Sequence, residues 1–464
     1  MQISKQNYRI APDTLAWLGA LMLLGIVVRV MLLLAYEPQQ FPDTGTYLQA
    51  ARDLVSGDFS MGLARRTPGY PLLIVLVGEA PRALMLAQML IGLTTAVALF
   101  GITRSLTSSN ALAFAVGASY HLNLQQLFTE ATLITESLSS FSIAAVMWAF
   151  LLAMRRLHEG RGGPAMLVAV SLLSAFALMV RPQFLFLPLL LPALAMYALT
   201  GWARPTWRSV GAAAWLALPA IAVILAWCAV VQAKVGPFAM STQSGFGLVN
   251  HVTDYIEMAP DRYAVARDVL VKTRDARIQE VGHSRNTIWY AWPDIQRVTG
   301  WTLPEASRQL QRMCTEMIVA QPARYALSVA SAWVDFWTVP NFWRTEAIHP
   351  AGLATVLQRV WWGEHLLLRL GNLAFVLMVV AVLVSGAARR RLQWDVGMTA
   401  MAATVLASSL IQALADQGAS SRYHLPTQPI VVLMLALAWS RARNARWVTH
   451  SVPVSTRPTP TKAA

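Results

Sequence analysis

Long apolar segments recur through most of this chain, and they constrain its fold more than any other feature of the sequence. A run of about 17–25 apolar residues is long enough to cross the hydrocarbon core of a bilayer as a helix. Of the 464 residues, 56% are hydrophobic and only 13% are charged, whereas about a quarter of the residues in a soluble domain are charged. The sequence therefore predicts an all-α polytopic membrane protein.

About ten transmembrane helices are expected from these segments. The expected ranges are Leu15–Tyr36, Ala83–Ile102, Ala111–Leu127, Leu133–Met154, Pro164–Val180, Phe184–Leu199, Val210–Gln232, His365–Ala388, Val396–Ala415 and Leu425–Trp439. Tyr70–Gly78 is apolar but too short to span, so it is predicted to re-enter or to lie along the surface. No small-residue cleavage site follows the first span, which is therefore expected to be an anchor.

The basic loops predict an orientation, because loops rich in arginine and lysine tend to remain in the cytoplasm. Basic loops fall at alternate ends of the expected helices, around Lys5 and Arg9, Arg104, Arg155 to Arg161, Arg204 to Arg208, Arg389 to Arg391, and Arg441 to Arg446. They all face inward if the N-terminus is inside and the number of helices is even. This arrangement predicts a multi-pass membrane protein with acids and arginines of four loops gathered on the outer face. The composition, rich in arginine and poor in lysine, indicates a bacterial source and hence a cytoplasmic (inner) membrane.

Four regions follow from the same pattern. Residues 1–233 form an N-terminal transmembrane module of about seven helices, with a first outer loop at 37–82. Residues 234–362 are the one interval expected to form an extracytoplasmic domain, mostly helical and ending in a tryptophan-rich interfacial segment. Residues 363–440 hold the C-terminal transmembrane helices, and residues 441–464 form a cytoplasmic tail that is predicted to be disordered.

Two carboxylates are candidate catalytic groups. Asp43 follows the first span and is a candidate general base for an acceptor hydroxyl or amine; the alternative is that it caps the helix after it. Glu136 begins the fourth expected helix, where the helix dipole favours an acid, but ionisable groups near membrane depth usually face a cavity. The pair would also suit a divalent cation, Mg²⁺ or Mn²⁺, although nothing in the sequence demands one.

Arginines in the outer loops are candidate phosphate ligands, because the guanidinium group is a planar fork of donors that stays charged when it is dehydrated. Arg65, Arg66, Arg422 and Tyr423 are the predicted donor-phosphate residues. Contact with lipid head groups is the alternative interpretation of these arginines.

Motifs for nucleotide binding, hydrolysis and metal binding are missing from the sequence. The chain lacks GxxxxGK[ST], HExxH and GxSxG patterns and any Gly-rich dinucleotide turn, so a nucleotide donor held by a standard loop is not expected. Its two cysteines predict neither a disulfide framework nor a zinc site. The net charge of +14 comes largely from arginines in short loops rather than in a patch, which argues against a nucleic-acid partner.

Several motifs together resemble the GT-C membrane glycosyltransferases, and most closely family 39, which holds protein O-mannosyltransferases and the aminoarabinose transferase of lipid A. The motifs are Asp43 with Tyr47, Arg66-Thr67-Pro68-Gly69-Tyr70-Pro71, Thr135-Glu136-Ser137-Leu138, Arg181-Pro182, Gln321 to Tyr325, and Arg422-Tyr423-His424-Leu425-Pro426. The resemblance implies a polyprenyl-phosphate sugar donor, an extracytoplasmic site, Asp43 as the catalytic acid of the first loop and Arg66 as its basic neighbour. Many family members carry two adjacent acids where this chain has Asp43-Thr44, which leaves Glu130 or Glu136 as the second carboxylate.

The sequence thus predicts a glycosyltransferase that moves a hexose or pentose to an acceptor lipid, glycan or protein, with membrane lipids around it. Five further residues are predicted to bind substrate: Tyr47, Tyr70, Glu130, Lys234 and His424. Two alternatives remain open, a non-catalytic transporter or flippase of lipid-linked sugars and a polymerase or ligase of surface glycans.

Overall fold

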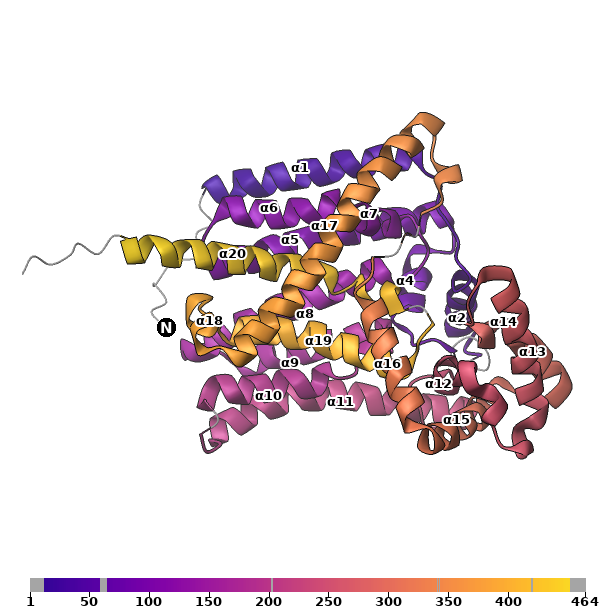
Figure 1. The fold of residues 1–464 in the computed structure, drawn as a ribbon. Coiled ribbons are helices and arrows are strands. Elements are labelled where there is room, and N and C mark those ends of the chain that lie inside the picture. The colour runs from indigo at the N-terminus through magenta and orange to yellow at the C-terminus, as the bar shows by residue number, and fades with distance from the viewer. Residues whose placement is uncertain are drawn as a thin grey trace, which may run out of the picture.

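A computed structural model describes residues 12–58, 65–201, 203–339, 341, 343–418 and 420–450, with backbone alone at Ser420 and residues 444–450. Helices make up the regular structure of this part of the chain, apart from two isolated β-bridges (Figure 1). The prediction of an all-α, multi-pass membrane protein is therefore confirmed. The tail at 451–464, with Lys5 and Arg9, lies outside the described residues.

Seven of the described helical segments are long and apolar enough to cross a membrane. They are α1 (Pro12–Ala35), α5 (Pro81–Thr107), α8 (Glu136–His158), η1 with α10 (Pro182–Thr200), α11 (Trp207–Val235), α17 (Ala351–Val384) and α19 (Val396–Ala415). The other three expected spans correspond to α6 (Asn110–Leu122) with α7 (Leu124–Glu130), to α9 (Pro164–Val180), and to α20 (Gln428–His450), which are shorter or more polar.

The boundaries differ from expectation where a polar side chain interrupts an apolar run. The range expected as Ala111–Leu127 is divided at Asn123, whose Oδ1 accepts a hydrogen bond from the Gln126 backbone N–H at 2.9 Å and caps α7. A buried asparagine that satisfies a free helix end in this way starts a new helix. At the other end of the chain, α20 continues to His450, past position 441, where the tail was expected to begin.

A group of shorter helices covers one end of the bundle (Figure 1). It comprises α12 (Ser244–Val252), α13 (Ala264–Val281), α14 (Thr287–Thr299) and α15 (Leu303–Ala320), which enclose a hydrophobic core of their own. Next along the chain, α16 (Pro322–Phe336) returns to the bundle and packs on α19, where Trp333 Nε1 donates to Ser409 Oγ at 3.1 Å.

Two short helices of the segment after α1 lie at this same end, α2 (Thr44–Ser56) and α4 (Gly69–Val77) (Figure 1). The first turn of α4 packs directly on the end of α9. A Cβ atom at Gly69 would lie only 2.5 Å from the backbone nitrogen of Val180, so only glycine permits this approach. This contact places the residues before α4 beside Arg181, which follows Val180.

Candidate active site

Asp43 is held in place by the backbone around it. Gln39 forms a short parallel bridge with the segment before α8, since its N–H donates to Ala131 O at 2.8 Å and its C=O accepts from Leu133 N at 3.0 Å. Thr44, which is buried, donates from Oγ1 to Leu133 O at 2.9 Å. The loop that carries Asp43 is thereby joined to the segment that leads into Glu136.

Arg66 reaches the same point from the segment just before α4. Its guanidinium group lies 4.4 Å from the centre of the Tyr47 ring, and its Nε donates to Thr46 Oγ1 at 2.9 Å. Tyr47 in turn packs edge-on against Tyr70, with ring centres 5.1 Å apart. An arginine stacked on a ring and hydrogen-bonded at Nε has little freedom, so its outer nitrogens are aimed at a fixed position.

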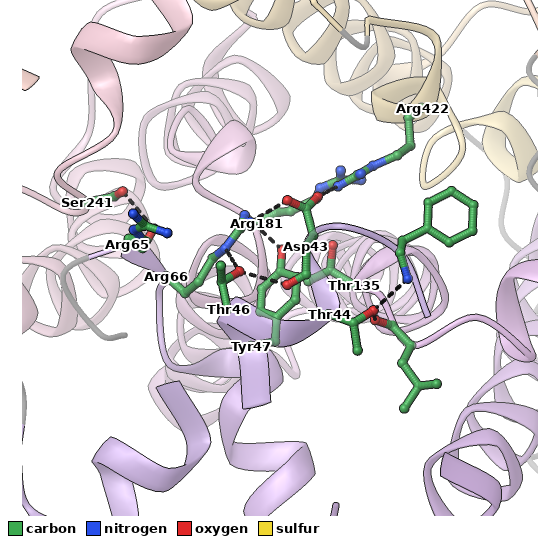
Figure 2. A network of polar contacts seen from close by, with 12 residues as sticks. Asp43, Thr44, Thr46, Tyr47, Arg65, Arg66, Thr135, Arg181, Ser241 and Arg422 are labelled. Carbon is green, nitrogen blue, oxygen red and sulfur yellow. Dashed lines mark hydrogen bonds and ion pairs between the residues drawn. The ribbon is translucent and has the colours of Figure 1, made fainter. Parts of the chain in front are cut away.

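Five side chains from distant parts of the chain form one ion-pair network, of which Figure 2 shows Asp43, Arg66, Arg181 and Arg422. Asp43 accepts from Arg66 Nη2 on Oδ1 at 2.5 Å and lies 2.7 Å from Arg422 Nη2 through Oδ2. The same Arg422 places Nε 2.6 Å from Glu136 Oε1. Glu136 Oε1 is also 3.1 Å from Arg181 Nη2. Arg422 therefore bridges the two carboxylates that the sequence singled out.

The alternative role of Asp43 as a helix cap is not what the structure shows. Asp43 occupies the N-cap position of α2, but its side chain makes no capping hydrogen bond. The carboxylate is engaged by the two arginines instead, and its side chain remains 28% exposed. Glu136, by contrast, is fully buried behind Arg422 and Arg181.

Arg181 belongs to this network but was not among the predicted site residues. It ends α9 as its C-cap residue, and its guanidinium group lies 4.4 Å from the centre of the Tyr423 ring. Tyr423 thus packs beneath Arg181 and beside Arg422, whose Cζ is 5.8 Å from the same ring. The available signal was an arginine directly after an apolar span, at membrane depth, where a charge is costly unless it has a function or a partner.

The two arginines change the acidity of Asp43. Burial alone would raise the pKa of Asp43, but the charges of Arg422 and Arg66 and the hydrogen bonds they donate hold it well below its ordinary value. An opposite charge within about 4–6 Å favours the ionised form in this way. In the free protein Asp43 is therefore a carboxylate with little tendency to take up a proton.

A cavity of about 610 Å³ opens against this network. Its lining includes four arginines, Arg65, Arg66, Arg181 and Arg422, together with Tyr47, Tyr423 and the carboxylate-bearing Asp416. Within the described lining, Arg181 Nη1, Gln412 Nε2 and Gln183 Oε1 are buried without a hydrogen-bond partner. Buried polar atoms of this kind are costly unless a ligand or water satisfies them.

Asp416 faces this cavity from the end of α19. Its Oδ1 accepts from Asn250 Nδ2 at 2.7 Å and from the Gly418 N–H at 2.9 Å. Burial is the main cause that raises the pKa of Asp416. These contacts join the loop that carries Arg422 to α12, so the helices at the end of the bundle take part in positioning the network.

Four of the predicted substrate-binding residues lie away from the cavity lining. Tyr70 is buried beneath Tyr47, and its hydroxyl donates to Gln88 Oε1 at 3.0 Å. Lys234 is exposed on the last turn of α11. His424 is buried, with Nε2 3.1 Å from Asn372 Oδ1, and it joins α17 to the loop before α20.

Glu130 is the fourth, and it forms a separate buried pair with Arg29 of α1. Glu130 Oε1 accepts from Arg29 Nη2 at 2.5 Å, while Arg29 Nη1 lies 3.0 Å from His121 Nδ1. The lack of a side chain at Gly92 makes room for this pair, because a Cβ there would fall 1.8 Å from Glu130 Oε1. Of the two acids considered as the second carboxylate, the structure brings Glu136 to Asp43 and leaves Glu130 elsewhere.

The donor set at Asp43 and Glu136 does not fit a divalent cation held by protein ligands. The Arg422 guanidinium group occupies the position between the two carboxylates, 2.7 Å from one and 2.6 Å from the other. Within the described residues there is no group of three or more His, Cys, Asp or Glu side chains that could hold a metal ion. The Arg422 guanidinium group places a positive charge at this point.

No protein-family model matches this sequence, and no curated protein matches it at a significant level. Among solved structures, the chain is similar to the archaeal oligosaccharyltransferase AglB from Archaeoglobus fulgidus, in complex with an inhibitory peptide and a dolichol-phosphate. The similarity has a TM-score of 0.45 and 12% sequence identity and covers 98% of this chain and 53% of that one, so this chain spans about half the length of AglB. A likeness at this level assigns no activity, so the function is inferred below from the geometry of the site.

Proposed function

We propose that this protein is a GT-C-type glycosyltransferase that moves a sugar from a polyprenyl phosphate to an acceptor lipid, glycan or protein. The single observation that carries the proposal is the Arg66–Asp43–Arg422–Glu136 network at the wall of a cavity lined by four arginines. It combines a partly exposed carboxylate with cations that have apolar surroundings, which are the two elements that such a transfer requires.

The arginines supply the site for the donor phosphate. A polyprenyl-phosphate sugar is a phosphodiester with one negative charge, and loss of the sugar leaves a phosphate monoester with a second. Fixed donors aimed at an oxygen where charge develops lower the barrier to such a step. Arg65, Arg66, Arg181 and Arg422 line one cavity, and the unpartnered Arg181 Nη1 offers a donor there.

Apolar residues in the same lining suit the lipid part of the donor. Val180, Leu185 and Ile411, at the ends of the helices of the bundle, line the cavity with the arginines. Leu185 is 44% exposed, as expected of a position that faces lipid. A chain of isoprenoid units can therefore remain among apolar side chains while its phosphate reaches the guanidinium groups.

Asp43 acts as the general base in this proposal. The acceptor oxygen attacks the anomeric carbon while the bond from that carbon to the phosphate oxygen breaks. The acceptor proton passes to Asp43, and the bonding electron pair stays on the polyprenyl phosphate. Attack on the face opposite the leaving group inverts the anomeric carbon.

Binding of the donor would also activate this base. In the free protein Arg66 and Arg422 keep the pKa of Asp43 low. A phosphate that takes hydrogen bonds from the same guanidinium groups weakens their hold on Asp43, so its basicity rises when the donor is in place. Glu136 is fully buried behind Arg422 and Arg181 and contacts both arginines, which makes it a positioning residue in this proposal.

The proposed location is a bacterial inner membrane with the site on the extracytoplasmic side. Basic residues lie at the ends of the helices remote from the site, among them Arg104 in the last turn of α5, Arg155 and Arg156 in that of α8, and Arg389 to Arg391 in α18 (Gly386–Arg391). Such residues favour the cytoplasmic side. The helices around the cavity would then project into the periplasm or the extracellular space.

The test is transfer from a panel of polyprenyl-phosphate sugars by purified protein, with release of polyprenyl phosphate as the readout. We expect Asp43→Asn to reduce the rate by about 10²–10⁴-fold, the range that general base catalysis contributes. Glu79→Gln is the matched control, because Glu79 pairs with Arg52 at 2.7 Å on the same end of the molecule but is exposed.

The alternatives predict other outcomes. A transporter or flippase would move lipid-linked sugar across vesicles without releasing polyprenyl phosphate, in the wild type and in Asp43→Asn alike. A glycan polymerase or ligase would tolerate Asp43→Asn. Equal release by wild type and Asp43→Asn would overturn the catalytic assignment.

A further inference from the structure

A second part of the cavity lining differs in composition from the part that carries the arginines. It is built from the segment after α11 and from α12 and α14, and it includes Met240, Gln243, Ser244, Leu248 and Trp289. This wall belongs to the helices at the end of the bundle, and none of its described lining residues is an arginine. It offers one large aromatic surface and several uncharged polar groups instead.

Trp289 is held rigidly at this wall. One face of its indole ring stacks on Phe246, with ring centres 5.2 Å apart and planes only 12° from parallel. Phe246 is fully buried and is fixed from a second side by Trp292, edge-on at 5.2 Å. The Trp289 side chain is nevertheless 39% exposed and lines the cavity. The protein core therefore covers one face of the indole and leaves surface available to a ligand.

Amide groups that could bind hydroxyls accompany the ring. Gln412 Nε2 and Gln183 Oε1 line the same cavity, are buried, and have no partner among the described residues. Gln243 and Ser244 belong to the wall of Trp289 itself. A donor and an acceptor left unpaired in the same cavity as an exposed indole ring fit a ligand that has an apolar face and a polar rim.

A sugar ring has this shape. Its axial C–H groups form an apolar face with slight positive charge, which is attracted to the negative face of an aromatic ring. Its hydroxyls project from the rim and both donate and accept hydrogen bonds. We propose that Trp289 is the stacking platform for a sugar ring bound in this cavity, the ring belonging either to the lipid-linked donor or to a carbohydrate acceptor. This inference rests on the proposed glycosyltransferase function.

Direct binding tests it without relying on transfer. Protein labelled with 5-fluorotryptophan gives ¹⁹F resonances, and the one missing from Trp289→Phe identifies Trp289. The probes are undecaprenyl phosphate, undecaprenyl-phosphate mannose and undecaprenyl-phosphate glucose, and the methyl glycosides of the same sugars. A shift with the sugar-bearing lipid but not with undecaprenyl phosphate assigns the ring to the donor. A shift with the glycosides alone assigns it to the acceptor.

Kinetics supply the second readout, with the donor that the wild type uses. We expect Trp289→Ala to raise KM for the sugar-bearing partner about three- to tenfold, with kcat little changed, since an aromatic contact contributes about this much. Trp289→Phe keeps an aromatic face and should recover most of the loss. Tyr290→Ala is the matched control, because Tyr290 is an exposed aromatic of the same helix that is not part of the cavity lining.

The two proposals fail in different ways. If no lipid-linked sugar is consumed but a glycoside moves the Trp289 resonance, the sugar platform stands and the transferase does not. If transfer proceeds and depends on Asp43, while Trp289→Ala matches the wild type and no probe moves the resonance, the platform is overturned. If Trp289→Ala weakened the binding of undecaprenyl phosphate as much as the binding of its sugar conjugates, the platform would also be overturned, since the effect would then not depend on a sugar.

Discussion

Arg422 Nη2 lies 2.7 Å from Asp43 Oδ2, although almost the whole chain separates the two residues. The same guanidinium group contacts Glu136 through Nε at 2.6 Å. One planar side chain thus sets the distance between a partly exposed carboxylate and a fully buried one. This relationship is the centre of the proposed site, and most of the tests below act on it.

Arg422→Lys should separate charge from geometry. An ammonium group keeps the positive charge, but it is a point donor on a flexible stem and cannot bridge two carboxylates as a planar fork does. We expect the transfer rate to fall by about 10²–10³-fold, the usual cost of one donor to a developing oxyanion. Arg52→Lys, in the exposed pair with Glu79, is the control and should retain the wild-type rate. Wild-type turnover by Arg422→Lys would show that only the charge matters.

Glu136→Gln should lower stability as well as activity. Glu136 is fully buried between Arg181 and Arg422. Its neutralisation therefore removes the negative charge that balances two guanidinium groups in a site shielded from water. Removal of one partner of a buried ion pair costs about 3–5 kcal/mol. A fall in the Tm of the purified protein, measured with the transfer rate, tests this. A stable but inactive variant would instead indicate that Glu136 acts directly on substrate.

Gly69→Ala should disturb the site from a distance. The added Cβ would lie 2.5 Å from Val180 N and 2.6 Å from Met179 C, and backbone atoms cannot move aside as a side chain can. We expect a loss of about 1–3 kcal/mol in stability, with reduced activity because α4 and Arg181 move apart. Gly45→Ala is the paired control, since nothing lies within 4 Å of a Cβ there. Equal behaviour of the two variants would contradict the close approach of α4 to α9.

The pH profiles of kcat and kcat/KM should differ on the acid side. In the free enzyme, burial raises the pKa of Asp43, but the charges of Arg422 and Arg66 outweigh burial, and the pKa is lowered overall. Asp43 therefore stays ionised above about pH 4, the ordinary pKa of an aspartate. kcat/KM, which reports the free enzyme, should therefore show no acid limb from Asp43 between about pH 5 and 8. Once the donor phosphate engages the arginines, the pKa rises, and the acid limb of kcat moves to higher pH. An acid limb of kcat/KM that lies above that of kcat would contradict this exchange.

Removal of divalent cations should leave the transfer rate unchanged. The Arg422 guanidinium group lies between Asp43 and Glu136, so the proposed reaction has no step through a metal ion at these carboxylates. Transfer is measured after dialysis against excess EDTA, with and without added Mg²⁺ or Mn²⁺. Loss of activity that either ion restores would place a metal in the reaction and would return the two carboxylates to the role of ligands.

The sequence by itself determined the class of this protein, because membrane-spanning helices depend on local hydropathy and length. The ends of α9 and α19 were predicted to the residue. Asp43, Arg66, Glu136 and Arg422 were also recognisable, since charged residues beside an apolar span are costly and need a reason to be there.

Only the tertiary structure decided which of these polar groups meet. Glu130 and Glu136 lie six positions apart and are both fully buried, yet one pairs with Arg29 and the other with Arg181 and Arg422. His424 packs between helices although it is two residues from Arg422. Arg181 and Trp289 reach the cavity through the close contact at Gly69 and the core around Phe246. Contacts of this kind depend on how helices distant in sequence pack, which local hydropathy and short motifs do not encode.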